Sequence, residues 1–137
     1  MMTVPTGLET IGRLVLATVL GFVIGLEREA AGQSAGERTH ALVALGSAAF
    51  GLLSITAFPG SDTSRVAAGV VTGLGFLGAG TILKSGDTQV RGLTTAAGMW
   101  AVGAIGLAIG SGRYFLGLAT AIVAGVISAD RNAYAQT

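Results

Sequence analysis

The sequence predicts an all-α integral membrane protein, built as a bundle of about five short, glycine-rich transmembrane helices. Only 11% of the residues are charged, against about 25% in an average soluble domain. The apolar residues make up 51% of the chain, and its mean hydropathy is +0.72. The chain also has 23 glycines. Glycine weakens a soluble helix by about 1 kcal/mol relative to alanine, whereas in membranes small residues let two helices approach closely.

The chain of 137 residues predicts one domain, covering residues 1–137. Each of its apolar runs has the minimum length for crossing a hydrocarbon core of about 30 Å. Strands are excluded, because they usually have about 4 to 8 residues and a membrane barrel would show polar and apolar alternation. The predicted spans are residues 8–26, 41–58, 66–83, 93–109 and 114–129.

Turn-forming or charged residues separate these runs. Ser61 to Ser64 offers N-cap candidates for the third helix. The separating segments are 27–38, 59–62, 85–87 and 110–112.

The charge and cysteine content exclude several classes of function. A net charge of +1 gives no field that would attract nucleic acid. No cysteine is present to make a disulfide or a thiolate metal site. No nucleophile and base pair stands out, so we expect no enzyme, no cofactor and no metal site. The first seven residues have no Lys or Arg, so we expect no cleaved signal peptide.

The distribution of Lys and Arg predicts the orientation in the membrane. With five spans, one side holds five basic residues, and the other side holds Arg13, Arg65 and Arg113. We therefore expect the N-terminus outside and the C-terminus in the cytoplasm of a bacterial inner membrane. The five basic residues on the predicted cytoplasmic side are Arg28, Arg38, Lys84, Arg91 and Arg131.

Two sets of charged residues are candidate functional sites. Glu9 and Arg13 are one helical turn apart near the start of the first span. They either reach out to water or make a polar contact inside the bundle, where charges are costly. The second set brackets the first connection: Glu27, Arg28, Glu37, Arg38, Thr39 and His40.

This second set has two interpretations. It is either a collar of solvated charges or a paired site at the cytoplasmic mouth, in which Glu27 or Glu37 neutralises Arg28 and Arg38. His40 is the only histidine, so a metal site there is not expected. It remains a candidate for a proton-sensitive group.

The glycines of the third span form the pattern G-x-G-x-x-G at Gly73, Gly75 and Gly78, and continue to Gly80. A dinucleotide site is rejected, because that pattern requires a preceding strand. The glycines serve either close helix packing or a locally broken helix that exposes backbone groups in the membrane.

Thr94 and Thr95 could cap the fourth helix or bond to the turn before it. Trp100 is expected to pack between helices, because it lies deeper than an interfacial residue.

Small residues recur four positions apart at Gly21 and Gly25, Gly69 and Gly73, and Gly106 and Gly110, and at Gly117 with Ala121 and Gly125. This spacing favours packing within the bundle, with one face left for a homodimer.

Four motifs and one tryptophan, in this order and spacing, resemble the membrane domain of the MgtC/SapB family from about Leu8 to Gly125. They are Gly21-x-x-x-Gly25-Leu26-Glu27-Arg28-Glu29, Arg38-Thr39-His40-Ala41-Leu42-Val43, Gly73-Leu74-Gly75-Phe76-Leu77-Gly78-Ala79-Gly80 and Val90-Arg91-Gly92-Leu93-Thr94-Thr95-Ala96-Ala97, with Trp100 after them.

The resemblance implies a bacterial inner-membrane protein linked to magnesium limitation, acid stress and virulence. It also implies a regulator that contacts membrane proteins such as the ATP synthase or a P-type ATPase. Longer family members carry a C-terminal domain resembling an ACT fold, which we do not expect in this sequence.

The leading hypothesis is a non-enzymatic regulator, surrounded by the lipid bilayer, that acts through helix contacts. The alternatives are a small ion or proton channel or transporter that uses the third helix with Glu9 and Arg13, and a scaffold without either activity.

Overall fold

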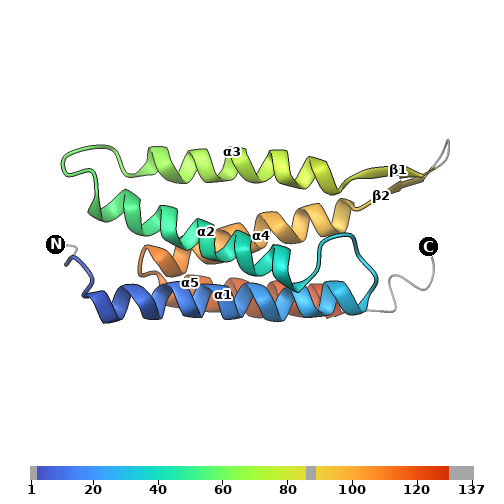
Figure 1. Ribbon diagram of the computed structural model, residues 1–137, viewed down its shortest axis with the longest axis horizontal. Coiled ribbons are helices and arrows are strands. Elements are labelled where there is room, and N and C mark those ends of the chain that lie inside the picture. The colour runs from blue at the N-terminus through green and yellow to red at the C-terminus, as the bar shows by residue number, and fades with distance from the viewer. Residues whose placement is uncertain (1–2, 86–88, 130–137) are drawn as a thin grey trace.

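A computed structural model describes residues 3–85 and 89–129 and shows an all-α bundle with one short hairpin (Figure 1). The predicted all-α membrane bundle is confirmed. The elements are α1 (Gly7–Ala30), α2 (Glu37–Thr56), α3 (Ser64–Thr81), β1 (Leu83–Ser85), β2 (Gln89–Arg91), α4 (Leu93–Gly110) and α5 (Tyr114–Ala129).

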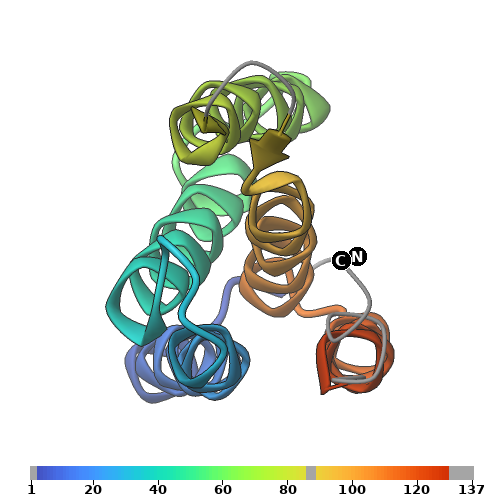
Figure 2. The ribbon, with the colours of Figure 1, turned by 90° about the vertical axis from the view of Figure 1, so that its right-hand side faces the viewer.

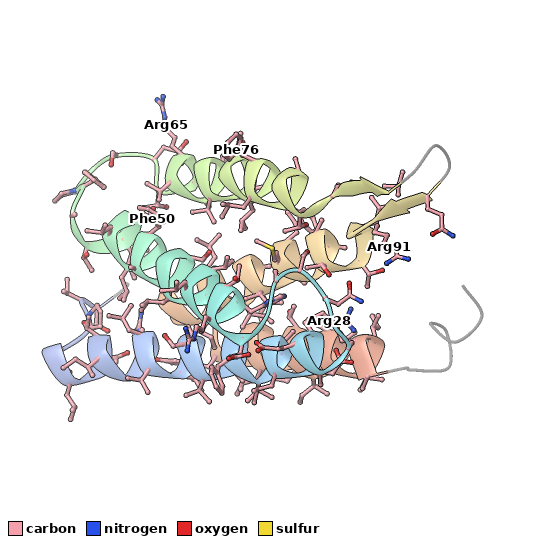
Figure 3. All side chains as sticks on the ribbon, turned by 45° about the vertical axis from the view of Figure 1, so that its right-hand side comes forward. Arg28, Phe50, Arg65, Phe76 and Arg91 are labelled. Atoms are coloured by element: carbon pink, nitrogen blue, oxygen red, sulfur yellow. The ribbon has the colours of Figure 1, made fainter. Side chains whose placement is uncertain are left out.

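Helices α2 and α4 form the centre of the bundle. Seen from one end, α1 and α5 lie on one side of this pair and α3 lies on the opposite side (Figure 2). The start of α1 and the end of α5 lie at opposite ends of the molecule (Figure 1). The exposed side chains of Arg65 and Arg91 lie at these two opposite ends, Arg65 at the end where α1 begins and Arg91 at the end where α5 finishes (Figure 3).

Three helices are long and apolar enough to cross a membrane: α1, α2 and α4. Helix α5 is equally apolar but has 16 residues. Helix α3 has 18 residues, but it begins at Ser64 and so includes Arg65. With this charge and its many glycines, it is not among the helices that are long and apolar enough to cross a membrane. Its role as a transmembrane span therefore remains a prediction.

Two helices extend further than the apolar runs. Helix α1 continues to Ala30, and α2 begins at Glu37. The charged residues on both sides of the first connection therefore stand on helical turns. The loop that joins the two helices is correspondingly short.

A short antiparallel hairpin, which the sequence analysis missed, joins α3 to α4. Leu83 pairs with Arg91 and Ser85 with Gln89. The predicted turn at residues 85–87 falls largely outside the described residues. Gly92 follows with a φ of +95°, and a Cβ there would lie 2.0 Å from the Thr81 carbonyl oxygen. Only glycine lets α4 begin directly against the end of α3.

Glycines on α1 and α4 bring these helices into backbone contact with α2. A Cβ on Gly21 would lie 2.6 Å from the His40 carbonyl oxygen, and one on Gly106 would lie 2.3 Å from that of Ala44. Gly25 and Gly110 make similarly close approaches to α2. These two pairs of small residues therefore serve packing within the chain.

We predict that Gly106→Ala lowers the free energy of unfolding by about 1 to 3 kcal/mol, because the new methyl group collides with backbone that cannot move aside. The measurement is unfolding in mixed micelles of increasing denaturing detergent, followed by circular dichroism. Gly12→Ala is the matched control, since nothing lies within 4 Å of a Cβ there. Equal stability of the two variants would show that the α2–α4 contact tolerates side chains.

Candidate functional site

The charged side chains of the described residues gather at the two ends of the bundle. At the end where α1 begins, Arg13 is 7% exposed and binds three groups. It pairs with Glu9, and its Nη1 donates to the Gly110 carbonyl oxygen at 2.9 Å. Its Nε donates to the Tyr114 hydroxyl at 2.9 Å. The guanidinium carbon also lies 5.6 Å from the centre of the Tyr114 ring, within range of a cation–π contact.

Arg13 therefore makes a polar contact inside the bundle, whereas the side chain of Glu9 remains 43% exposed. The arginine joins three helices, because Gly110 ends α4 and Tyr114 begins α5. Carbonyls in the last turn of a helix have no helical partner and carry partial negative charge, so a cation there is favourable. Tyr114 was not identified from the sequence.

The opposite end of the bundle contains a second buried arginine. Arg28 is fully buried, and its guanidinium forms an ion pair with Glu27 at 2.7 Å. Its Nη2 donates to the Ser128 carbonyl oxygen at 2.8 Å. Because Ser128 lies in the last turn of α5, this bond connects the ends of α1 and α5. Figure 3 labels Arg28.

Two more buried polar side chains, at the starts of α2 and α4, lie at the same end of the bundle as Arg28. His40 is fully buried, with Nδ1 2.9 Å from the Gly36 carbonyl oxygen. Its Nε2 has no hydrogen-bond partner among the described residues and faces Gly98 of α4. Thr95 is also fully buried and donates to the Gln33 side-chain oxygen at 3.0 Å. We call Arg28, Gln33, His40 and Thr95 the buried polar cluster.

The remaining predicted members of this site lie at its rim. Arg38 and Thr39 are exposed, and Glu37 is half-buried. Within residues 3–85 and 89–129, no ion pair joins Arg38 to Glu27 or Glu37. The Glu37 amide donates to the Glu29 carboxylate at 3.3 Å, which satisfies one amide at the start of α2.

The two threonines at the start of α4 do not cap it. The N-cap is Gly92, and it makes no side-chain cap bond. Thr95 turns instead toward Gln33 in the first connection, and Thr94 is exposed.

The glycine-rich run lies in a continuous helix, so α3 is not broken. Only Gly78 packs against another helix, with a Cβ position 3.4 Å from that of Ala96 on α4. Gly73, Gly75 and Gly80 are exposed, and nothing lies within 4 Å of a Cβ at any of them.

The expectation for Trp100 is wrong. Trp100 is 56% exposed and stands on an outer face of α4, because the inner face of this helix is occupied by Met99 and Val102.

A bundle of apolar helices with glycine-mediated backbone contacts, and with charges buried at its two ends, defines a small polytopic membrane protein. The MgtC family model matches residues 14–135. The chain belongs to the MgtC family.

Three named relatives show the extent of the similarity. YhiD of Escherichia coli K12, named as a candidate magnesium transporter, is 48% identical over 118 residues, which are 80% of this chain and 54% of YhiD. Protein MgtC of Salmonella typhimurium is 47% identical over 110 residues, 80% of this chain and 47% of that protein. Protein SrpB of Synechococcus elongatus is 47% identical over 119 residues, 77% of this chain and 65% of SrpB.

The chain spans about half the length of the curated relatives it matches. No solved structure matches it.

We predict that Arg28→Lys lowers the free energy of unfolding by about 1 to 3 kcal/mol, the range for a lost buried hydrogen bond. An ammonium group cannot reproduce the planar fork that reaches Glu27 and the Ser128 carbonyl together. Detergent unfolding followed by circular dichroism measures the change.

The matched control is Arg38→Lys, which makes the same substitution at an exposed position in the next helix. It should change the stability by less than about 0.5 kcal/mol. If both variants lost a similar amount of unfolding free energy, the buried contacts of Arg28 would contribute no more to stability than the exposed side chain of Arg38 does.

Proposed function

We propose that this protein is a non-enzymatic regulator in the bacterial inner membrane, active when magnesium is limiting. It acts by contact between its helix α3 and a helix of another membrane protein, for which the ATP synthase and a P-type ATPase are the candidates that the family resemblance suggests. The name of the Escherichia coli relative refers to magnesium, which supports the physiological setting. The N-terminus lies outside and the C-terminus in the cytoplasm, as the loop charges indicate.

The exposure of α3 is the observation that carries this proposal. Among its 18 residues, only Leu74 and Gly78 are buried. On the side away from Gly78, Phe76 is 82% exposed (Figure 3). Gly80 stands one turn after Phe76 on the same face. A small residue beside a large apolar one forms a notched surface that suits close approach of another helix.

The close packing in the centre of the bundle argues against an ion pathway through one copy of the chain. Ala44, Ala48, Val102 and Ile105 are all fully buried between the two polar ends. Here α2 and α4 touch backbone to backbone. A hydrated ion would have to separate these helices in order to pass through one copy of the chain. Regulation is therefore favoured over conduction, although the name of the Escherichia coli relative points to transport for that protein.

The regulatory contact is tested with a pair of glycine substitutions on α3. Gly80→Leu should abolish both co-purification of the ATP synthase and growth of a complemented deletion strain at limiting Mg²⁺, because leucine fills the notch beside Phe76. Gly75→Leu is the matched control. Gly75 is equally exposed and equally free of neighbours, but it lies about 140° away around the helix.

Immunoblots of membrane fractions should show equal amounts of both variants. Normal growth and co-purification with Gly80→Leu would exclude this face of α3 as the contact. Loss with both variants would also argue against it, since the effect would not depend on the face.

Transport is tested separately in proteoliposomes loaded with a Mg²⁺-sensitive dye. We expect no Mg²⁺ flux above that of empty liposomes under an imposed gradient. Flux that disappears in Glu9→Gln would overturn the regulatory proposal in favour of a pathway along the Glu9–Arg13 pair.

A further inference from the structure

A groove separates α2 from α3 along much of their length. It encloses about 840 Å³, which is within the range of about 300 to 1,000 Å³ for small-molecule sites. Its walls are apolar: Leu42 and Phe50 line it from α2, and Val66 and Leu77 line it from α3. Figure 3 labels Phe50 on α2. The groove is separate from the buried polar cluster, which faces α1 and α4.

Missing side chains create this groove. Gly46 on α2 and Gly69 and Gly73 on α3 all line it. Nothing lies within 4 Å of a Cβ at any of the three. An apolar cavity left empty lowers stability in proportion to its volume. In a membrane, the acyl chains of the surrounding lipids are available to fill it.

The shape of the groove selects a thin occupant. Helices α2 and α3 are joined at one end by the loop that contains Phe58, a lining residue, and they diverge toward the other end (Figure 1). A helix with its side chains is about 10 Å wide, and the connecting loop prevents it from lying along the whole groove. A single acyl chain can enter from the open end and extend toward Phe58.

The open end carries positive charge. Thr39 lines the groove there, and Arg38 is exposed one helical turn before the lining residue Leu42. Arg38 has no ion pair within the described part of the chain. Loop charges place this end on the cytoplasmic side, where anionic headgroups attract basic residues at the membrane surface. A guanidinium with a neighbouring hydroxyl suits a phosphate group.

We propose that the groove between α2 and α3 binds one acyl chain of an anionic phospholipid, with the lipid phosphate at Arg38 and Thr39. The chain fills the space above Gly46, Gly69 and Gly73. The headgroup charge selects the lipid, and the apolar walls hold it through detergent extraction.

The experiment measures retained lipid. The purified protein is reconstituted with equal amounts of phosphatidylglycerol and phosphatidylcholine, extracted in mild detergent, separated from free lipid and analysed by mass spectrometry. The wild type should retain about one phosphatidylglycerol per chain and little phosphatidylcholine. Gly46→Leu should lose the retained lipid, because its side chain fills the groove. Gly12→Leu, on α1 with equally open space around it, should retain it.

Arg38→Gln separates the two parts of the site. It should reduce the preference for phosphatidylglycerol over phosphatidylcholine by roughly fivefold, the effect expected of one basic residue at a membrane surface. Thr94→Val, an exposed substitution at the same end, should leave the preference unchanged. Circular dichroism and gel filtration confirm that each variant is folded.

Three results would overturn the proposal. One is equal retention of phosphatidylglycerol by Gly46→Leu and the wild type. Another is the same headgroup preference in Arg38→Gln as in the wild type. The third is a smaller oligomer for Gly46→Leu than for the wild type on gel filtration, without loss of lipid, which would assign the groove to a second copy of the chain. Gly46 and Arg38 are on α2 and are read out by retained lipid, whereas the regulatory contact is tested at Gly80 on α3 by growth and co-purification, so failure of one proposal can be told from failure of the other.

Discussion

The structure depends on the backbone contact that glycine permits between α2 and its neighbours. Gly21 and Gly25 bring α1 against α2, and Gly106 and Gly110 bring α4 against α2. Lipid tails are as apolar as leucine, so helix association in a membrane relies on close packing rather than on the hydrophobic effect. Larger residues would hold the helices apart, and the side chains that cross between their ends would no longer reach their partners.

This close packing explains how two arginines can be buried in an apolar bundle. Arg13 donates to the carbonyl of Gly110 at the end of α4, and Arg28 donates to that of Ser128 in the last turn of α5. Each arginine thus satisfies a carbonyl that has no partner in its own helix and lies at the negative end of the helix dipole. Each also pairs with a glutamate of its own helix. The bundle therefore buries its cations where electrostatics favours them, at opposite ends of the molecule.

The sequence predicts what is local and misses what is brought together by folding. Long uncharged runs predict the helices, because length and composition suffice for a membrane environment. The pairing of Glu9 with Arg13 and of Glu27 with Arg28 is also local. Tyr114 and Ser128, however, are about 100 positions from the arginines that they contact, and no pattern in a single sequence connects them. Trp100 was misplaced because depth along a helix does not reveal which face a residue occupies.

Helix α3 differs from the others because it has few neighbours in the chain. Gly78 fixes one side of it against α4, while the groove leaves its side toward α2 without protein contacts along much of its length. A helix held on one side can change its tilt at low cost in packing energy. Whatever fills the groove therefore determines the position of Phe76 and of the outer face. A lipid between α2 and α3 would couple the composition of the membrane to the surface that a partner meets, and this coupling requires no movement in the glycine-packed centre of the bundle.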